Sequence, residues 1–289
     1  MSYVIITDTS ADLPREISEK YGIEAVPLSY TVDGEEYVTK PGDDEEMKRF
    51  YDLMRERKHE ISTSMANGEE FAPKFESILK EGKDILYIGF SSGLSGTVES
   101  VSAALLKLSE KYPERKIYSV DTLAASAGEG LIVLLTARKR EEGATIDEAR
   151  DYAESIKLSV CHWFTVDDLD YLRRGGRISK AVAIIGSVLQ IKPVLHVNDE
   201  GHLIAVGRAK GRRASIEKLC AKIGARGINP SEQTIMISHG DCLEDAEYAA
   251  EIIKRDYSPK EVIISYVDTT IGAHSGPGTL AIFFIGEKR

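Results

Sequence analysis

GFSSGLSGT at residues 89–97 is the glycine- and serine-rich turn from which the fold of this chain can be predicted. The apolar run at 85–88 before it indicates a buried strand. After it, apolar residues recur with the spacing of one helix face, at Val98, Val101, Leu105 and Leu108. The order of strand, tight turn and helix is typical of an α/β unit.

The same turn has the chemistry of an anion site. A helix N-terminus presents unpaired backbone N–H groups and the positive end of the helix dipole. Glycines let the backbone approach a ligand closely, and serines add hydroxyl donors. Together they suit a carboxylate or a phosphate. A well-capped α/β loop without any ligand has the same pattern, so this stretch alone leaves both interpretations open.

The first half of the chain alternates strands with helices, which favours a parallel sheet covered by helices. Strands are predicted at 4–7, 24–30, 85–88 and 116–120. Asp33-Gly34 indicates a hairpin turn. Capping-box spacing marks helices that begin near residue 43 and run from 145 to about 158. The first of these helices carries an apolar stripe that fits a plain core better than the wall of a lipid-sized cavity: Met47, Phe50, Tyr51 and Met54.

From residue 159 onward the pattern changes to a mixed α/β domain. A short strand at 163–166 and an apolar helix at 181–189 precede an antiparallel hairpin, 191–197 with 202–209. Helices at 214–225 and 243–254 then alternate with strands at 234–238, 261–266 and 279–285. We therefore predict two domains, an N-terminal α/β domain at 1–158 and a C-terminal domain with a mixed sheet at 159–289. The packed cleft between them is a common place for a ligand.

Composition excludes several classes of protein. The 289 residues are 42% hydrophobic and carry a net charge of −10, which argues against a nucleic-acid binder. Three widely spaced cysteines without a C-x-x-C pair argue against a disulfide framework or a zinc site. The N-terminus shows no signal-peptide pattern, and the longest apolar run, 181–191, falls short of the about 20 residues needed to span a bilayer. We expect a soluble, cytoplasmic protein.

Residues 89–93 also match G-x-S-x-G, the nucleophile elbow of serine esterases. In that interpretation Ser91 attacks, and His274 with Asp241 or Asp268 completes a triad. The match is weak, because the elbow's helix begins at the nucleophile and here residues 94–96 intervene.

Two further features carry functional groups. His274 is the one functional side chain in a predicted rigid loop of small residues at 271–278. Two basic clusters stand out in an acidic chain, and they are either solvated surface or, as we favour, patches for an anion or a partner. Their members are Arg173, Arg174, Arg177, Arg208, Lys210, Arg212 and Arg213.

The chain resembles the DegV family of bacterial fatty-acid-binding proteins, the lipid-carrying subunits of fatty acid kinase. The matching stretches run from end to end: TDTSADLP at 7–14, TS at 63–64, SSGLSGT at 91–97, LRRGGRIS at 172–179, IKPVL at 191–195 and HSGPG at 274–278. There are two departures. The family usually has Gln-Pro where this chain has Met65 and Ala66, and Thr where it has Ser275.

The resemblance implies a fatty acid buried between two domains. Its carboxylate would meet the hydroxyls of Thr63 and Ser95 and the backbone N–H of Gly96, with His274 close by. It implies a non-catalytic carrier, with no cofactor or metal, that presents the bound acid to a separate kinase subunit for conversion to acyl phosphate. It also leaves room for transient membrane contact during lipid exchange.

Transfer of a phosphoryl group to a buried carboxylate needs positive charge nearby. Arg177 and Arg208 are the candidates that the basic clusters offer for this role.

Overall fold

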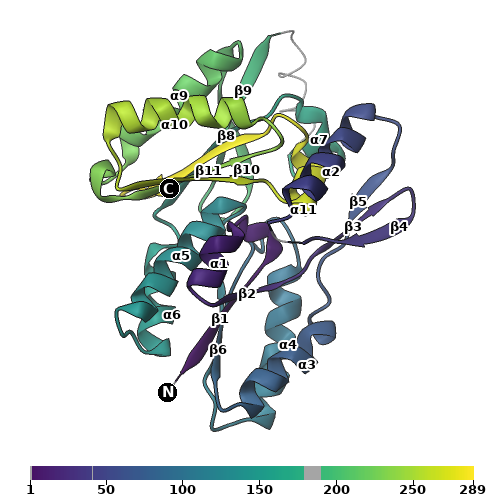
Figure 1. The fold of residues 1–289 in the computed structure, drawn as a ribbon, viewed down its shortest axis with the longest axis vertical. Coiled ribbons are helices and arrows are strands. Elements are labelled where there is room, and N and C mark those ends of the chain that lie inside the picture. Colours follow the sequence, from purple (N-terminus) through teal and green to yellow (C-terminus); the bar gives the residue numbers. More distant parts are fainter. Residues whose placement is uncertain (1, 41, 179–189) are drawn as a thin grey trace.

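The computed structural model describes residues 2–40, 42–178 and 190–289, which form two large sheets and one small one (Figure 1). The first large sheet, sheet A, is parallel throughout. Its strands, in spatial order, are β2 (Ile23–Val26), β1 (Tyr3–Asp8), β6 (Asp84–Gly89) and β7 (Ile117–Asp121).

The second large sheet, sheet C, is mixed, since β11 and β12 are parallel while its other described pairs are antiparallel. Its order is β10 (Leu203–Lys210), β9 (Ile191–Val197), β8 (Val160–Thr165), β13 (Leu280–Ile285), β11 (Thr234–His239) and β12 (Glu261–Tyr266). The small antiparallel sheet B joins β4 (Glu35–Val38), β3 (Ser29–Val32) and β5 (Ile61–Thr63). The predicted α/β fold, a parallel sheet followed by a mixed one, is confirmed.

Helices cover the sheets, and sheet B projects beside two of them, α2 and α11 (Figure 1). The described helices are α1 (Arg15–Lys20), α2 (Asp44–Glu56), α3 (Gly68–Lys80), α4 (Thr97–Lys111), α5 (Ala127–Glu141), α6 (Ile146–Ile156), α7 (Leu169–Arg174), α9 (Arg212–Arg226), α10 (Leu243–Tyr257) and α11 (Thr269–Ser275). Short 3₁₀ turns are η1 (Thr9–Ala11) and η2 (Pro230–Glu232). The helix predicted at 181–189 lies outside the described residues.

The single strand predicted at 24–30 is wrong. The chain instead forms β2, which pairs with β1, and then β3, which belongs to sheet B. Pro27 lies between them, and proline has no N–H to donate to a strand ladder. The break lets the chain leave sheet A and build the small sheet that carries Thr63.

Helix α5 is absent from the sequence-based prediction, although it is central to the fold. Leu131, Ile132, Val133 and Leu134 are all fully buried, so most faces of the helix are apolar. An all-round apolar helix shows no 3.6-residue period and is buried on several sides. Accordingly α5 contacts β1 and β6 of sheet A and also β8, β11 and β13 of sheet C.

The apolar stripe of α2 is core, as favoured above. Phe50, Tyr51 and Met54 are buried with residues of β3 and α7 in one cluster. The helix begins where predicted, because Asp43 Oδ1 accepts a hydrogen bond from Glu46 N at 3.0 Å. The predicted capping box at Thr145 is complete, with both reciprocal hydrogen bonds formed.

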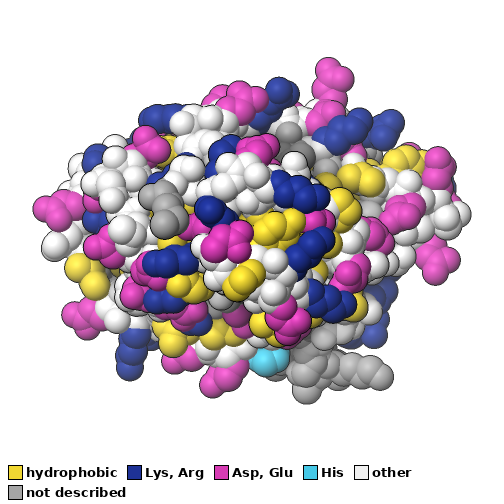
Figure 2. Space-filling view, turned by 90° about the horizontal axis from the view of Figure 1, so that it is seen from below, with side chains coloured by type: hydrophobic (Ala, Val, Ile, Leu, Met, Phe, Trp, Pro, Cys, Tyr) yellow, Lys and Arg dark blue, Asp and Glu magenta, His cyan; other side chains and the backbone are white. Residues whose placement is uncertain are grey.

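Charged side chains of both signs are interspersed over the face seen from below (Figure 2). Among the described residues, every helix is too short or too polar to cross a membrane. The domain boundary at 158 stays a prediction. The strands of sheets A and C fall on either side of it, but one hydrophobic cluster runs from Ile5 of β1 through α5 to Phe283 of β13.

Candidate functional site

The turn at 89–97 is held in a defined shape at the start of α4. The backbone N–H groups of Leu94 and Ser95 both donate to Ser91 O at 3.1 Å. Ser95 Oγ lies 3.0 Å from Thr97 Oγ1 and accepts from Thr97 N at 3.3 Å. Gly96 is the N-cap residue of α4, and its own N–H forms no hydrogen bond within the described chain. The turn therefore presents a backbone donor at the positive end of a 15-residue helix.

His274 lies on a helix, which corrects the prediction of a rigid loop at 271–278. It occupies the last turn of α11, and the loop proper begins at Gly276. The helix forms because Asp268 caps it, accepting from Ile271 N at 2.8 Å. Gly272 allows close packing on α2, since a Cβ there would stand 2.6 Å from the Tyr51 hydroxyl oxygen.

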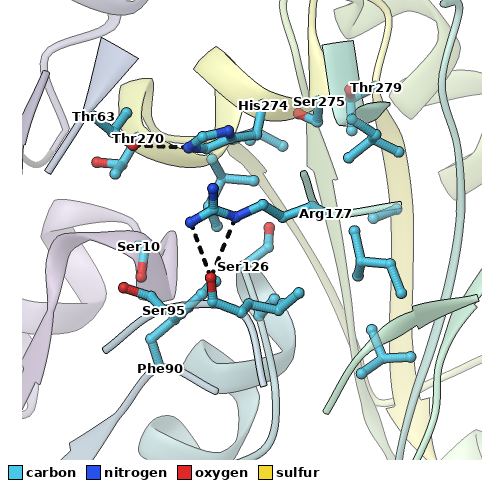
Figure 3. Close-up of a pocket in the computed structure, with 18 of the residues that line it drawn as sticks. Ser10, Thr63, Phe90, Ser95, Ser126, Arg177, Thr270, His274, Ser275 and Thr279 are labelled. Atoms are coloured by element: carbon cyan, nitrogen blue, oxygen red, sulfur yellow. Dashed lines mark hydrogen bonds between the residues drawn. The ribbon is translucent and has the colours of Figure 1, made fainter. Parts of the chain in front are cut away.

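His274 and Thr63 meet from opposite halves of the chain. His274 Nε2 lies 2.7 Å from Thr63 Oγ1 at the end of β5 (Figure 3). Burial, and then the positive charge of Arg177, lower the pKa of the His274 imidazole to about 4. The imidazole is therefore neutral near pH 7, and it acts as a hydrogen-bonding group rather than as a charge.

Arg177 provides the positive charge of the site. Its Nε and Nη2 donate to Leu94 O at 3.2 and 3.0 Å, and its Nη1 donates to Gly175 O at 2.6 Å. Burial lowers the pKa of the guanidinium from its usual value, and no described carboxylate forms an ion pair with it. A half-buried cation whose partners are only carbonyl dipoles favours an anionic ligand.

These groups line one end of a pocket of about 310 Å³. Thr63, Ser95, Gly96, Arg177 and His274 all contribute to its wall, and Arg177 lies between His274 and Ser95 in Figure 3. Much of the remaining wall is apolar and comes from both halves of the chain: Phe90, Leu94, Phe164, Leu172, Val197, Leu203, Ala281 and Phe283. The pocket combines a polar end with a long apolar wall, which suits an amphipathic acid.

Two other candidate residues lie elsewhere. Arg208 is exposed on β10 and is not part of the pocket wall. Ser91 is fully buried, and its Oγ donates to Gly201 O at 3.0 Å and accepts from Gly93 N at 3.1 Å.

The hydrogen bonds of an esterase triad are not formed. His274 is bound to Thr63, Asp268 caps α11, and Asp241 pairs with Arg55. Ser91 therefore has no described acid–base partner, and its contacts are those of a structural serine.

The structure adds pocket residues that the sequence patterns did not indicate. Ser126 Oγ donates to a carboxylate oxygen of Asp12 and lies 2.8 Å from Ser238 Oγ. Asp12 Oδ1 also accepts from Asp268 N at 2.8 Å. Burial, and then the charge of Asp268, raise the pKa of Asp12 well above its usual value.

For two of the pocket serines, Ser10 and Ser238, a signal was present in the sequence. Ser10 and Ser238 lie at the carboxyl ends of parallel strands, where ligands of α/β proteins collect. Ser126 has φ 58° and ψ −149°, a backbone conformation that no local sequence pattern predicts.

Among the described residues, no group of three or more histidine, cysteine or acidic side chains is placed to hold a metal ion. An α/β protein with a largely apolar pocket that also carries neutral donors and an arginine has the lining of a small-molecule binding protein. Comparison with known proteins identifies its family. The family model described as an uncharacterised protein of the DegV family matches residues 2–287, and the chain belongs to this family.

Relatives cover the whole chain. A DegV domain-containing protein of Clostridium perfringens is 45% identical over 99% of this chain and 98% of its own length. A DegV lipid-binding protein of Thermotoga maritima has a solved structure with a TM-score of 0.88 and 29% identity, covering all of both chains. The solved structure of DegV of Bacillus subtilis, a fatty-acid-binding protein, has a TM-score of 0.84 and 27% identity, and it covers 99% of this chain and all of its own.

The electrostatics of the site predict the titration of His274. In ligand-free protein, NMR should show its imidazole protonating near pH 4 rather than near 6.5, because burial disfavours the charged form. Between these values the unfolded chain binds more protons than the folded one, so this group destabilises the fold as the pH falls from 6.5 towards 4.

Arg177→Gln should raise the His274 pKa towards 6.5 by removing the like charge. Arg173→Gln is the matched control, since Arg173 pairs with Asp170 and should leave the titration unchanged. A wild-type midpoint at or above pH 6 would contradict this account of the site.

Proposed function

We propose that this protein binds a long-chain fatty acid in the pocket, with the carboxylate at Thr63, Ser95, Gly96, Arg177 and His274. The observation that carries the proposal is that the half-buried Arg177 and the unpaired N–H of Gly96 lie in the wall of one largely apolar pocket. The solved DegV relatives described as lipid- or fatty-acid-binding support it. A carrier of another small acid with an apolar tail is the nearest alternative.

The tail should dominate the affinity, and the donors should fix the orientation. A chain of about 14 methylenes contributes roughly 11 kcal/mol gross when buried, at ~0.8 kcal/mol each. A hydrogen bond to a charged group contributes about 1.5–3 kcal/mol net. Several donors must still converge, because a buried carboxylate without partners is costly.

The bond between His274 and Thr63 suggests how the donors are aligned. A neutral imidazole with its proton on Nε2 donates to Thr63 Oγ1 across the 2.7 Å contact. The threonine hydroxyl hydrogen is then directed to the carboxylate. In this arrangement His274 is a positioning residue that keeps Thr63 a donor.

The proposed role is that of a non-catalytic cytoplasmic carrier with two domains, at 1–158 and 159–289. It presents the bound carboxylate to a separate kinase subunit for phosphorylation to acyl phosphate and exchanges lipid in transient contact with membranes. Arg177 would balance charge beside the carboxylate. Arg208, exposed on β10, would face the kinase rather than the ligand.

The direct test is to denature purified protein, extract it and identify the lipid by mass spectrometry. We expect a long-chain fatty acid at near one per chain, because the pocket is continuous with the apolar core. Repeated preparations that contain no lipid and take up no added fatty acid would refute the proposal. A different acid in the extract would decide for the alternative carrier.

Donor variants separate the carrier from an esterase. Thr63→Ala combined with Ser95→Ala should weaken fatty-acid binding by at least about tenfold, because loss of even one of the two hydrogen bonds to a charged group has that effect. Ser91→Ala should bind normally, because its hydroxyl contacts only backbone groups. A titration with a fluorescent fatty acid measures both. Ester hydrolysis that is lost in Ser91→Ala would establish the esterase instead.

The phosphorylation step should respond to charge without an equal loss of binding. Arg177→Ala, Arg208→Ala and His274→Ala should each lower acyl-phosphate formation by the cognate kinase about tenfold or more, which corresponds to ~1.4 kcal/mol on the barrier. Binding should stay nearly intact in Arg208→Ala, because Arg208 lies outside the pocket wall. Arg177→Ala and His274→Ala should lose some binding, because both residues are proposed at the carboxylate, but less than they lose in turnover, since the tail still holds the ligand. Turnover is measured beside a binding titration for each variant. Wild-type turnover in all three would remove these residues from the kinase step.

A further inference from the structure

Met65 is an exposed apolar side chain at the polar end of the pocket. It is 61% exposed and lines the pocket wall, whereas the other described methionines, Met47, Met54 and Met236, are at most 4% exposed. Its sulfur lies against Gly96, since a Cβ on that glycine would stand 2.8 Å from Met65 Sδ. The thioether is thus open to solvent and also adjacent to the proposed carboxylate site.

The backbone on either side of Met65 is anchored by hydrogen bonds. Thr63 is held by His274 at 2.7 Å, and Ala66 N donates to Thr97 Oγ1 at 3.2 Å. Thr97 Oγ1 in turn lies 3.0 Å from Ser95 Oγ. Only Ser64 and Met65 lie between the anchors, so Met65 stays next to the start of α4, where its sulfur lies against Gly96.

We propose that Met65 is a site of oxidation by peroxide, and that its sulfoxide lowers the retention of the bound fatty acid. This inference rests on the proposed function of the pocket. A sulfur lone pair attacks one oxygen of hydrogen peroxide, the O–O bond breaks, and an S–O bond forms. The sulfur loses two electrons, the peroxide is reduced, and water leaves.

The product changes the chemistry at the head of the ligand. A thioether is a weak hydrogen-bond acceptor, whereas a sulfoxide is polar and its oxygen accepts strongly. The sulfur lies against Gly96, and Ser95 is the residue before it, so the nearest donors along the chain are two of the groups proposed for the carboxylate. The sulfoxide therefore competes with the ligand for the same donors and replaces an apolar cover by a polar one.

The test loads full-length protein with isotope-labelled palmitate and treats it with graded hydrogen peroxide. Peptide mapping by mass spectrometry follows the sulfoxide at each methionine, and gel filtration follows the palmitate that remains. We expect Met65 to be oxidised before Met47, Met54 and Met236. Palmitate should dissociate about tenfold faster or more once Met65 is oxidised, since one hydrogen bond to a charged group contributes about 1.5–3 kcal/mol net. Methionine sulfoxide reductase should restore retention.

Met65→Leu is the matched control, because leucine keeps an apolar cover and cannot form a sulfoxide. Each protein is compared with its own untreated sample. Peroxide should leave retention by Met65→Leu unchanged. Unchanged retention by fully oxidised wild type, earlier oxidation of the buried methionines, or equal loss in Met65→Leu would each overturn the proposal. Untreated protein that retains no palmitate would instead refute the fatty-acid function, and this inference with it.

Discussion

The packing of α5 between the two large sheets is the interaction on which the rest of the structure depends. Its buried Leu131, Ile132, Val133 and Leu134 belong to one hydrophobic cluster with residues of both sheets. Each such side chain contributes about 1.5–3 kcal/mol when it leaves water. Arg138 also forms hydrogen bonds with sheet C: its Nη2 donates to Glu261 Oε2 at 2.7 Å and its Nη1 donates to Thr234 Oγ1 at 2.6 Å. The halves are therefore held at a fixed separation, and the pocket has walls from both.

Electrostatics divides the interior into two regions of different character. Among the described residues, the pocket wall contains one cation, Arg177, and the neutral imidazole of His274. The second region is a group of four buried acids: Asp8, Asp12, Glu129 and Asp268. Burial is the largest cause that raises the pKa of each. Hydroxyl groups donate hydrogen bonds to two of these carboxyl groups, Thr7 to Glu129 and Ser126 to Asp12. Burial disfavours the ionised form of each acid, which weakens the negative field that the group exerts on the neighbouring pocket.

Much of this arrangement could be predicted from the sequence, because local signals were strong where the fold is regular. The 89–97 turn, the hairpin at Asp33-Gly34 and the cap at Thr145 all follow from short-range chemistry. Thr63, Ser95, Gly96 and His274 were named through the family pattern, and the structure brings them together in one pocket with Arg177. That these residues bind a carboxylate remains a proposal.

The failures have physical causes. Helix α5 lacks the amphipathic period that reveals a surface helix. The break at Pro27 separates two strands whose combined pattern looks continuous. His274 was expected on a loop because small residues dominate 271–278, yet the cap at Asp268 and tight packing on Tyr51 make part of that segment helical. Such contacts between distant parts of the chain have no signature in a local sequence window.

A pocket walled by both halves also links occupancy to folding. A ligand that binds the folded chain alone stabilises it by RT ln(1 + [L]/Kd), about 2.7 kcal/mol when its free concentration is 100 times Kd. Because residues from both halves of the chain supply the wall, this free energy is not confined to one loop. Empty and filled forms would then differ in resistance to proteolysis, and a cell could remove empty molecules preferentially. A ligand held by walls from both halves of the chain would thus make occupancy a determinant of the protein's lifetime.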